Sequence, residues 1–171
     1  CMNGIGHHCG HIQMAELVAV LEALYRVKTG IRIDRLMAVS QLVRERTGVP
    51  MPLPSPVVGD FGFMIDGAYW AAEADIPYED RIHAKFPIPP GSVGNREQVI
   101  WAPGTITSGA VRARLRTLGL PEAEVDDETV EKVIWELEAL LRQRARYPNW
   151  ISDREFEQLC RDVLRHAGHV L

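Results

Sequence analysis

The chain has 171 residues, of which 46% are apolar and 25% are charged, so it can bury a hydrophobic core and is not a disordered polypeptide. Its formal net charge of −4, with 19 basic residues interleaved among 23 acidic ones, argues against a nucleic-acid partner, which needs a concentrated basic surface. The apolar runs are too short to span a membrane, so we expect no membrane partner, and we also expect no signal segment. With only three cysteines, this composition predicts a soluble, cytoplasmic protein.

The beginning of the chain predicts a strand followed by two helices. Residues 1–9 are apolar and then glycine-rich, which is typical of a strand that runs into a loop. Apolar side chains at three- and four-residue steps predict a helix over residues 13–28, with Gly30 as its C-cap. A second helix is expected to begin at Asp34, as the N-cap, and to end near Gly48.

Prolines and aromatic residues mark the middle of the chain. Alternating prolines from Pro50 to Pro56 exclude a helix and predict an extended connector. The small and aromatic residues of segment 61–74 predict a short buried helix. The segment 76–94 is rich in proline and glycine and predicts a loop, in which we place a domain boundary.

The last part of the chain predicts a small helical subdomain. Residues 97–102 favour a short strand, and Thr107 or the serine after it can cap the next helix. Asp126 or the following aspartate caps the longest helix. Ser152 and Glu155 have the spacing of a capping box and indicate where the final helix begins.

Short blocks along most of the chain resemble one enzyme family, in the same order and with similar spacing. Asn3, Gly4, Ile5 and Gly6, followed by Gly10, are similar to the turn "NGIGERAGN" that ends the barrel of that family. Residues 40–50, 57–63, 93–97 and 110–119 are similar to its segments "SRLVSRLTGIPV", "IVGENAF", "VGRE" and "AVRARLEELG". The chain therefore resembles the carboxyl-terminal part of the 2-isopropylmalate and homocitrate synthases, the TIM-barrel acyl-CoA condensing enzymes of the HMG-CoA lyase-like superfamily.

The resemblance implies a mainly α fold with minor β content. Residues 1–30 would be the last strand–helix element of a (β/α)8 TIM barrel, residues 31–94 a helical linker and active-site cover subdomain, and residues 95–171 a small helical C-terminal subdomain. It also implies partners. We expect the amino-terminal half of the barrel, as a separate chain or a missing segment, and assembly into a homodimer or a hetero-oligomer.

In the family, acetyl-CoA or a related acyl-CoA is condensed with a 2-oxo acid. A divalent metal ion (Mg, Mn, Zn or Fe) polarises the keto group, and a base removes a proton from the thioester methyl group. The family's metal ligands come from an early strand, from a paired-histidine motif and from the Asn of the glycine turn. Only the last of these regions is present here, so residues outside this chain would have to complete the metal site.

The glycine turn carries the first group of candidate residues. The resemblance makes Asn3, Gly4 and Gly6 candidates for substrate binding, and it makes His11, at the position of the family's metal-ligating Asn, a candidate metal ligand. Imidazole favours zinc or iron over magnesium. The run from His7 to Cys9, next to His11, leaves open a separate local metal site, or side chains that merely face solvent or a partner.

The second group of candidates lies where the family has the segments "HESGIH" and "GKHSG". Ile65 and Trp70 replace both histidines of the first segment, whereas Asp66 keeps a carboxylate at the Glu position, as a catalytic candidate or as an ordinary helix-surface acid. The second segment aligns with residues 103–107 and has lost its Lys and His. His83 is a candidate catalytic replacement, although an exposed loop histidine is usually only solvated.

The leading hypothesis is therefore a metal-dependent acyltransferase with altered catalytic residues, active when this chain is combined with the missing barrel half. A lyase or an aldolase of the same superfamily is the first alternative. A non-catalytic assembly or regulatory module of the same fold is the second.

Overall fold

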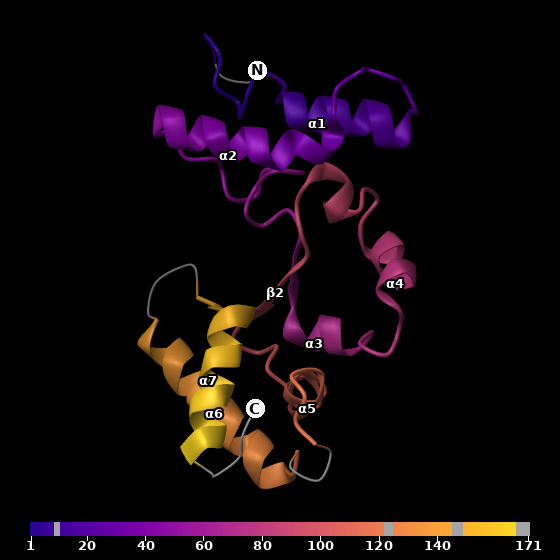
Figure 1. Cartoon of the computed structure of the whole chain (residues 1–171). Helices are drawn as coiled ribbons and strands as arrows, with labels where there is room; N and C mark the ends of the chain where they lie inside the picture. Colours follow the sequence, from indigo (N-terminus) through magenta and orange to yellow (C-terminus); the bar gives the residue numbers. More distant parts are fainter. Residues whose placement is uncertain (9–10, 122–124, 145–148, 167–171) are drawn as a thin grey trace. The chain divides into compact units, whose positions relative to one another are not determined.

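The computed structural model describes residues 1–8, 11–121, 125–144 and 149–166, and it is mainly helical with a small sheet (Figure 1). The chain forms two compact units. The first consists of Cys1–Met64 and Tyr78–Glu97, and the second consists of Ile65–Pro77 and the chain from Gln98 onward. The predicted mainly α character with minor β content is confirmed. None of the described helices is long and apolar enough to cross a membrane.

The first unit opens with a tight reversal of the chain instead of the predicted strand. Met2 and Ile5 form an isolated antiparallel bridge, and the Ile5 amide donates to the Met2 carbonyl at 2.8 Å. Asn3 and Gly4, at φ 50° and 75°, both adopt the left-handed conformation, as the Asn-Gly pair of a type I′ turn does. Within residues 1–8 this bridge is the only extended pairing, because the turn reverses the chain at once. The barrel element stays a prediction.

The first helix is shorter than predicted. α1 (Met14–Ala19) continues into a π-helical turn, η1 (Val20–Leu24), so the helical path ends four residues before Lys28. Arg26, at φ 56°, adopts the left-handed conformation just after the helix, whereas the sequence predicts Gly30 as the C-cap. The Glu22 carboxylate accepts hydrogen bonds from the backbone amide and the hydroxyl of Thr29, and these bonds turn the following loop back onto the helix.

The second helix has the predicted end but a different start. α2 (Leu36–Thr47) is followed by Gly48 in the left-handed conformation, as expected for a C-cap. Asp34 does not cap it, because this residue lies inside a preceding 3-10 turn, η2 (Ile33–Arg35), and its carboxylate is bound by Arg32 at 2.6 Å.

The segment predicted as a loop contains helices. α4 (Tyr78–Lys85) and the 3-10 turn η3 (Pro90–Val93) occupy most of residues 76–94. Acidic residues in the first turn of α4 and basic ones in its last turn complement the helix dipole, and Ile82 is buried. The core of the first unit combines side chains from α1, α2, the proline connector, the segment after that connector and η3, namely Ala15, Ala19, Leu36, Met51, Val57, Val58, Phe63 and Val93.

A small sheet organises the second unit. Its strands are β1 (Met64–Asp66), β2 (Gln98–Trp101) and β3 (Ile151–Ser152), in the order β1-β2-β3. β2 and β3 are antiparallel, with Trp101 opposite Ile151. β2 confirms the predicted strand, whereas the predicted helix over 61–74 is divided into β1 and the short helix α3 (Gly67–Ala71). The division follows from Asp66, whose extended backbone and side chain start α3.

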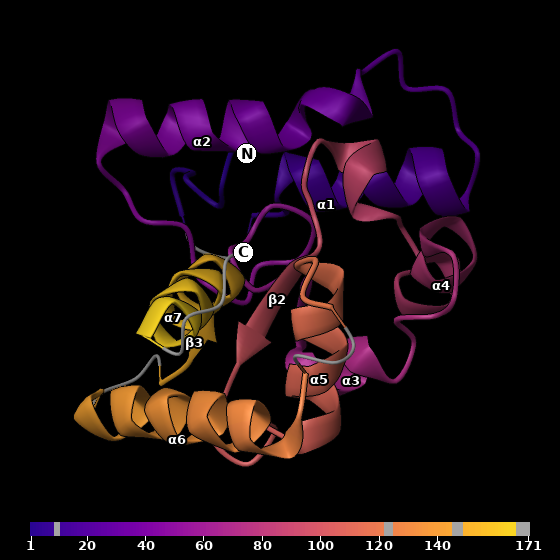
Figure 2. The same cartoon turned by 60° about the horizontal axis from the view of Figure 1, so that its bottom comes forward.

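The helices of the second unit begin where their caps predicted. α5 (Ser108–Thr117) and α6 (Asp127–Gln143) are capped by Thr107 and Asp126, each of which accepts a backbone amide hydrogen bond. α7 (Asp153–His166) follows the capping box of Ser152 and Glu155. In Figure 2, these helices surround β2 and β3. Trp101 stacks on Phe156 in the core between them, with ring centroids 4.0 Å apart.

Candidate functional site

The glycine turn forms one wall of an open hollow in the first unit, with a volume of about 530 Å³. Its other walls come from the residue just before α1 and from the connector after α2. The residues that line it are Asn3, Gly4, Ile5, Gly6, His7, His8, Gln13, Val49, Pro50 and Pro52. The turn residues predicted to bind substrate, Asn3, Gly4 and Gly6, are thus brought together around one concave surface.

Hydrogen bonds hold the glycine turn against the rest of the unit. The side-chain amide of Asn3 donates to the carbonyl of Ser40 in α2 at 2.9 Å. The amino group of Cys1 donates to the Ile12 carbonyl at 3.0 Å, and the Met14 amide donates to the Cys1 carbonyl at 2.8 Å. These bonds attach the start of the turn to α2 and to the segment just before α1.

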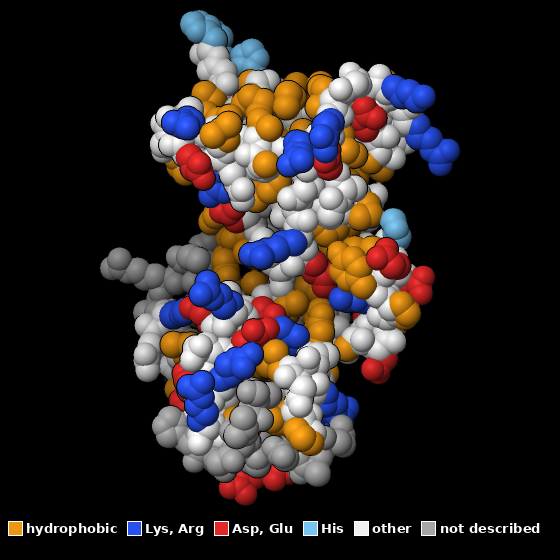
Figure 3. All heavy atoms as spheres, in the orientation of Figure 1, with side chains coloured by type: hydrophobic (Ala, Val, Ile, Leu, Met, Phe, Trp, Pro, Cys, Tyr) orange, Lys and Arg blue, Asp and Glu red, His pale blue; other side chains and the backbone are white. Residues whose placement is uncertain are grey.

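His11, the predicted metal ligand, is exposed beside the hollow and is not among its lining residues. Its imidazole lies directly against Gly6, where an added Cβ would be 2.9 Å from the His11 Cδ2 atom. Glycine at position 6 therefore permits the close approach of the His11 ring. His7 and His8 form the rim, with their rings edge to face and 4.4 Å apart. Histidine side chains project from this end of the surface in Figure 3.

The metal donors in the described part of the chain do not complete a metal site. No three of its His, Cys, Asp or Glu side chains form a group able to hold an ion. Cys9, which belongs to the local metal site that we considered, lies outside the described residues. His7, His8 and His11 each have an exposed side chain at the glycine turn, and imidazole is a common zinc ligand.

Asp66, a predicted catalytic residue, belongs to the second unit and caps α3. Its carboxylate accepts a hydrogen bond from the Tyr69 amide at 2.9 Å. The flanking positions at which the family carries histidine, Ile65 and Trp70, are both 9% exposed. The Trp70 ring also lies 5.4 Å from the guanidinium of Arg114. Both replacements are therefore buried apolar side chains.

His83, the other predicted catalytic residue, lies in the last turn of α4 and is exposed. It does not line the hollow, although both belong to the first unit. The structure thus groups Asn3, Gly4 and Gly6, places His11 next to them, and leaves His83 apart.

Sequence reasoning missed two polar side chains in the first unit, those of the partly buried Gln13 and the buried Ser40. The side-chain oxygen of Gln13 and the hydroxyl of Ser40 are buried, and neither has a hydrogen-bond partner in the described part of the chain. Gln13 occupies the N-cap position of α1 but does not cap it. A glutamine where Ser, Thr, Asp or Asn is preferred was the available sequence signal. Ser40, inside an ordinary helix pattern, offered none.

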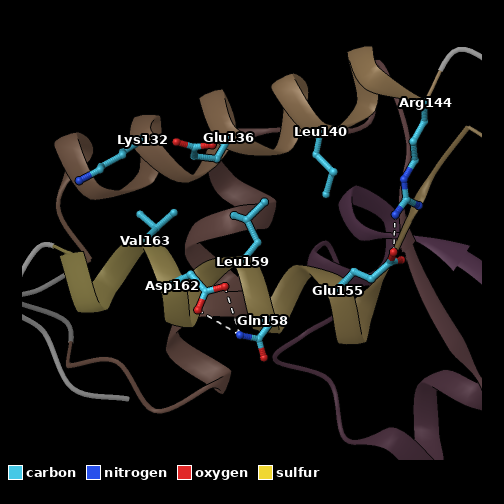
Figure 4. Close-up of a pocket in the computed structure, with 9 residues that line it drawn as sticks. All are labelled: Lys132, Glu136, Leu140, Arg144, Glu155, Gln158, Leu159, Asp162 and Val163. Atoms are coloured by element: carbon cyan, nitrogen blue, oxygen red, sulfur yellow. Dashed lines mark hydrogen bonds and ion pairs between the residues drawn. The ribbon is translucent and has the colours of Figure 1, made fainter.

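The second unit has its own groove, with a volume of about 610 Å³, between α6 and α7 (Figure 4). Leu140, Leu159 and Val163 form its apolar part, and the ion pair between Arg144 and Glu155 lies at one end. Burial by itself raises the pKa of Glu155, but hydrogen bonds from Arg144 and from Ser152 outweigh burial and lower that pKa to about 2. Glu155 of this ion pair also forms the capping box of α7. Helix capping therefore explains the charged side chains at this end of the groove.

Large apolar side chains are exposed on the first unit. Leu24, Tyr25 and Leu42, from the end of the first helical segment and from α2, are 52%, 72% and 50% exposed. Figure 3 shows hydrophobic side chains gathered over α1 and α2.

Comparison with curated proteins identifies relatives along nearly the whole chain, although no protein-family model matches it. A Methanopyrus kandleri protein assigned as an (R)-citramalate synthase is 33% identical over 95% of this chain. The homocitrate synthase of the same organism is 31% identical over 98% of this chain. The 2-isopropylmalate synthase of Methanocaldococcus jannaschii is 28% identical over 95% of it.

These matches cover only part of each relative. The chain spans 30%, 39% and 30% of the lengths of the three relatives. The resemblance seen in the short motifs thus extends through the chain, and most of each relative lies outside the matched region.

Proposed function

The chain belongs to the family of 2-isopropylmalate, homocitrate and citramalate synthases, and we propose that it is the carboxyl-terminal portion of a metal-dependent acyltransferase of that family. In this proposal the whole protein condenses acetyl-CoA, or a related acyl-CoA, with a 2-oxo acid. The observation that carries the proposal is the grouping of Asn3, Gly4 and Gly6 around one hollow, beside His11.

His11 is proposed to supply one ligand to the metal. Its imidazole is exposed and rests against Gly6, so that one ring nitrogen can face an ion without a change in the turn. When bound, the divalent metal would polarise the 2-oxo carbonyl group. The bond from Asn3 to Ser40 attaches the turn to α2, and in this proposal the turn presents its glycines to the substrate.

Asp66 and His83 are the proposed proton-transfer groups. Asp66 uses its Oδ1 atom to cap α3 through the Tyr69 amide, and the other carboxylate oxygen can accept a proton. His83 offers an exposed imidazole, the side chain that enzymes use most often as a general acid or base.

The partners of this chain are proposed to be the amino-terminal barrel half and further copies of the protein, as a homodimer or a hetero-oligomer. The exposed side chains of Leu24, Tyr25 and Leu42 support this proposal, because an isolated unit would leave them in water. The incomplete set of metal donors in the described residues also supports it.

The proposed reaction is tested with the whole protein that contains this chain, loaded with Mg²⁺, Mn²⁺, Zn²⁺ or Fe²⁺. Acetyl-CoA and a panel of 2-oxo acids are supplied, and the released CoA thiol is followed. We expect thiol release that requires both a 2-oxo acid and the metal. Acetyl-CoA without an acceptor is the control for hydrolysis. No release with any acceptor and any metal would refute the proposal.

A second candidate function is a lyase or aldolase reaction of the same superfamily. Ile65 and Trp70 favour it, because these buried apolar side chains replace the two family histidines and cannot perform their role in the condensation. Incubation with 3-hydroxyacyl-CoA compounds or 4-hydroxy-2-oxo acids, whose hydroxyl group lies β to the carbonyl, with detection of the new carbonyl product, separates the two reactions. Cleavage without condensation supports the lyase. Neither reaction, in a protein that still assembles with the barrel half, supports the non-catalytic module.

A further inference from the structure

We propose that a pocket in the second unit, between the turn before α5 and the end of α6, binds a primary alkylammonium group, and that Glu138 and Asn149 accept its hydrogen bonds. The pocket has a volume of about 360 Å³, within the range of pockets that hold small ligands. None of the residues proposed for the condensation lines it, so this inference is independent of the proposed function.

One wall of the pocket is a tight turn between β2 and α5. The Thr105 amide donates to the Ala102 carbonyl at 3.2 Å across this turn. Pro103 followed by Gly104, at φ 82°, gives the turn the residue pattern of type II. Proline brings no backbone N–H donor to the wall. Together with Ile106, this wall offers an incoming molecule apolar contacts and no charged group.

A second wall comes from the end of α6. Glu138, Leu141 and Arg142 are three and four residues apart, so they share one face of this helix. Leu141 is 5% exposed and adds to the apolar surface. The last carbonyl groups of a helix carry partial negative charge, and the carboxylate of Glu138 has the same sign. This wall therefore attracts a cation.

Asn149, just before β3, supplies a second acceptor. Its Oδ1 atom is buried, and no donor reaches it from any described residue. A buried carbonyl oxygen in this state is unfavourable and is rare in folded proteins. A ligand N–H that reaches this atom removes the penalty. An ammonium group has three N–H donors and no acceptor, which matches two acceptor side chains in one pocket.

Arg142 is the only positively charged side chain among the described residues that line the pocket, and a ligand can displace it. Its guanidinium meets the Glu138 carboxylate at 3.2 Å, but the two side chains are 61% and 53% exposed. Such a pair contributes little, so an ammonium group replaces the guanidinium at small cost. A carboxylate ligand would be attracted by Arg142, but it would meet the negative Glu138 and would leave the Asn149 oxygen unpaired.

The first test compares three probes of similar size in the native protein, namely n-butylammonium, n-butanol and butyrate. Methyl NMR signals of Ile106 and Leu141 report binding at the pocket. We expect n-butylammonium to bind about fivefold to tenfold more tightly than n-butanol, because hydrogen bonds from a charged donor are stronger. Butyrate should leave both signals unchanged. Equal binding of n-butanol, or tighter binding of butyrate, would overturn the inference without any variant.

Variants of Asn149 test the buried acceptor. Asn149→Leu keeps the volume and removes the acceptor, so it should weaken n-butylammonium binding about tenfold. It should fold as stably as the native protein or more stably, because it also removes the unpaired oxygen. Asn149→Asp keeps an acceptor, adds negative charge and should bind more tightly than native. Native affinity in Asn149→Leu would remove Asn149 from the site.

Arg142→Gln separates a cation site from an anion site. It frees the Glu138 carboxylate, so we expect it to tighten n-butylammonium binding about twofold to fivefold. Lys132→Gln is the matched control, because it removes the same charge from an exposed position of α6. That position is about 15 Å away along the helix, beyond the screening length of about 8–10 Å, so binding should stay native. Weaker binding in Arg142→Gln, or an equal gain in both variants, would overturn the role of Glu138.

Two further probes distinguish the sources of the ammonium group. Putrescine represents a free amine, and Nα-acetyl-lysine methylamide represents a lysine side chain of another protein. Binding of either one, read from the same methyl signals and weakened by Asn149→Leu, supports the site, and the tighter of the two identifies its source. Binding of neither would overturn the inference.

Discussion

The side-chain amide of Asn3 donates a hydrogen bond to the backbone carbonyl of Ser40, 37 residues further along the chain, at 2.9 Å. This bond joins the glycine turn, which carries the candidate substrate-binding residues, to the middle of α2. Asn3 also holds a left-handed backbone conformation, at φ 50°, which asparagine tolerates better than most residues. One residue thus fixes both the shape of the turn and its attachment.

We expect Asn3→Ala to destabilise the first unit by about 1–2 kcal/mol, because it removes the bond to Ser40 and places a poorly suited residue in the left-handed conformation. Asn3→Gly removes only the bond and relieves the backbone, so it should cost less than Asn3→Ala. Hydrogen exchange of the amides in α2 measures the difference. Equal exchange rates in the two variants would show that the backbone conformation contributes nothing.

Gly67 is expected to be indispensable for the second unit. An added Cβ at this position would lie 2.6 Å from ring atoms of Trp101, which is fully buried. Gly67→Ala should therefore destabilise the unit by about 1–3 kcal/mol through overpacking. Gly109→Ala is the matched control, because a Cβ there meets nothing within 4 Å.

The control should be neutral or should stabilise α5 by about 0.5–1 kcal/mol, since alanine is the better helix former. Urea denaturation followed by tryptophan fluorescence measures both variants. A Gly67→Ala protein as stable as Gly109→Ala would contradict the packing of Trp101 against α3.

The stability of α7 should depend on pH through Glu155. Its pKa falls from 4.5 to about 2 in the folded chain, so its contribution is complete above about pH 4.5 and is lost as the pH falls toward 2. Because its side chain is 43% exposed, solvent screening limits this contribution to about 1 kcal/mol. Glu155→Gln should remove most of this acid dependence, as measured by hydrogen exchange of α7 amides across the acid range.

Glu138→Gln provides the comparison for that experiment. Glu138 pairs with Arg142 on the exposed face of α6, at 3.2 Å, with side chains 53% and 61% exposed. Such a surface pair contributes little, so this variant should keep the native acid profile. An identical loss of acid dependence in both variants would exclude the capping box as its source.

His11 should decide which metal the assembled protein prefers, if it is a ligand as proposed. His11→Ala should lower the affinity for Zn²⁺ by more than about tenfold, since a direct ligand matters at least as much as its supporting residues. His11→Asn, which introduces the residue of the related synthases, should shift the preference toward Mg²⁺ or Mn²⁺, because an amide oxygen is a harder ligand than imidazole. Metal titration of the whole protein tests this. Unchanged Zn²⁺ affinity in His11→Ala would remove His11 from the site.

Local signals in the sequence predicted much of the second unit. Thr107, Asp126 and the pair Ser152 and Glu155 mark helix starts because a cap is a contact between residues two or three positions apart. The same reasoning was wrong for Asp34, whose carboxylate is taken by its neighbour Arg32. It was also wrong for residues 76–94, where proline content concealed the amphipathic helix α4.

The sequence by itself determined the family and the composition of the glycine turn, since both depend on the order of residues along the chain. Tertiary structure decided which side chains meet at that turn. Gln13 lies beneath it and contacts Ser55, 42 residues away, and Asn3 reaches Ser40 in another helix. Contacts over such separations form because α1, α2 and the proline connector pack into one core. A local sequence pattern spans only a few residues, so it cannot predict which polar atoms this packing brings together.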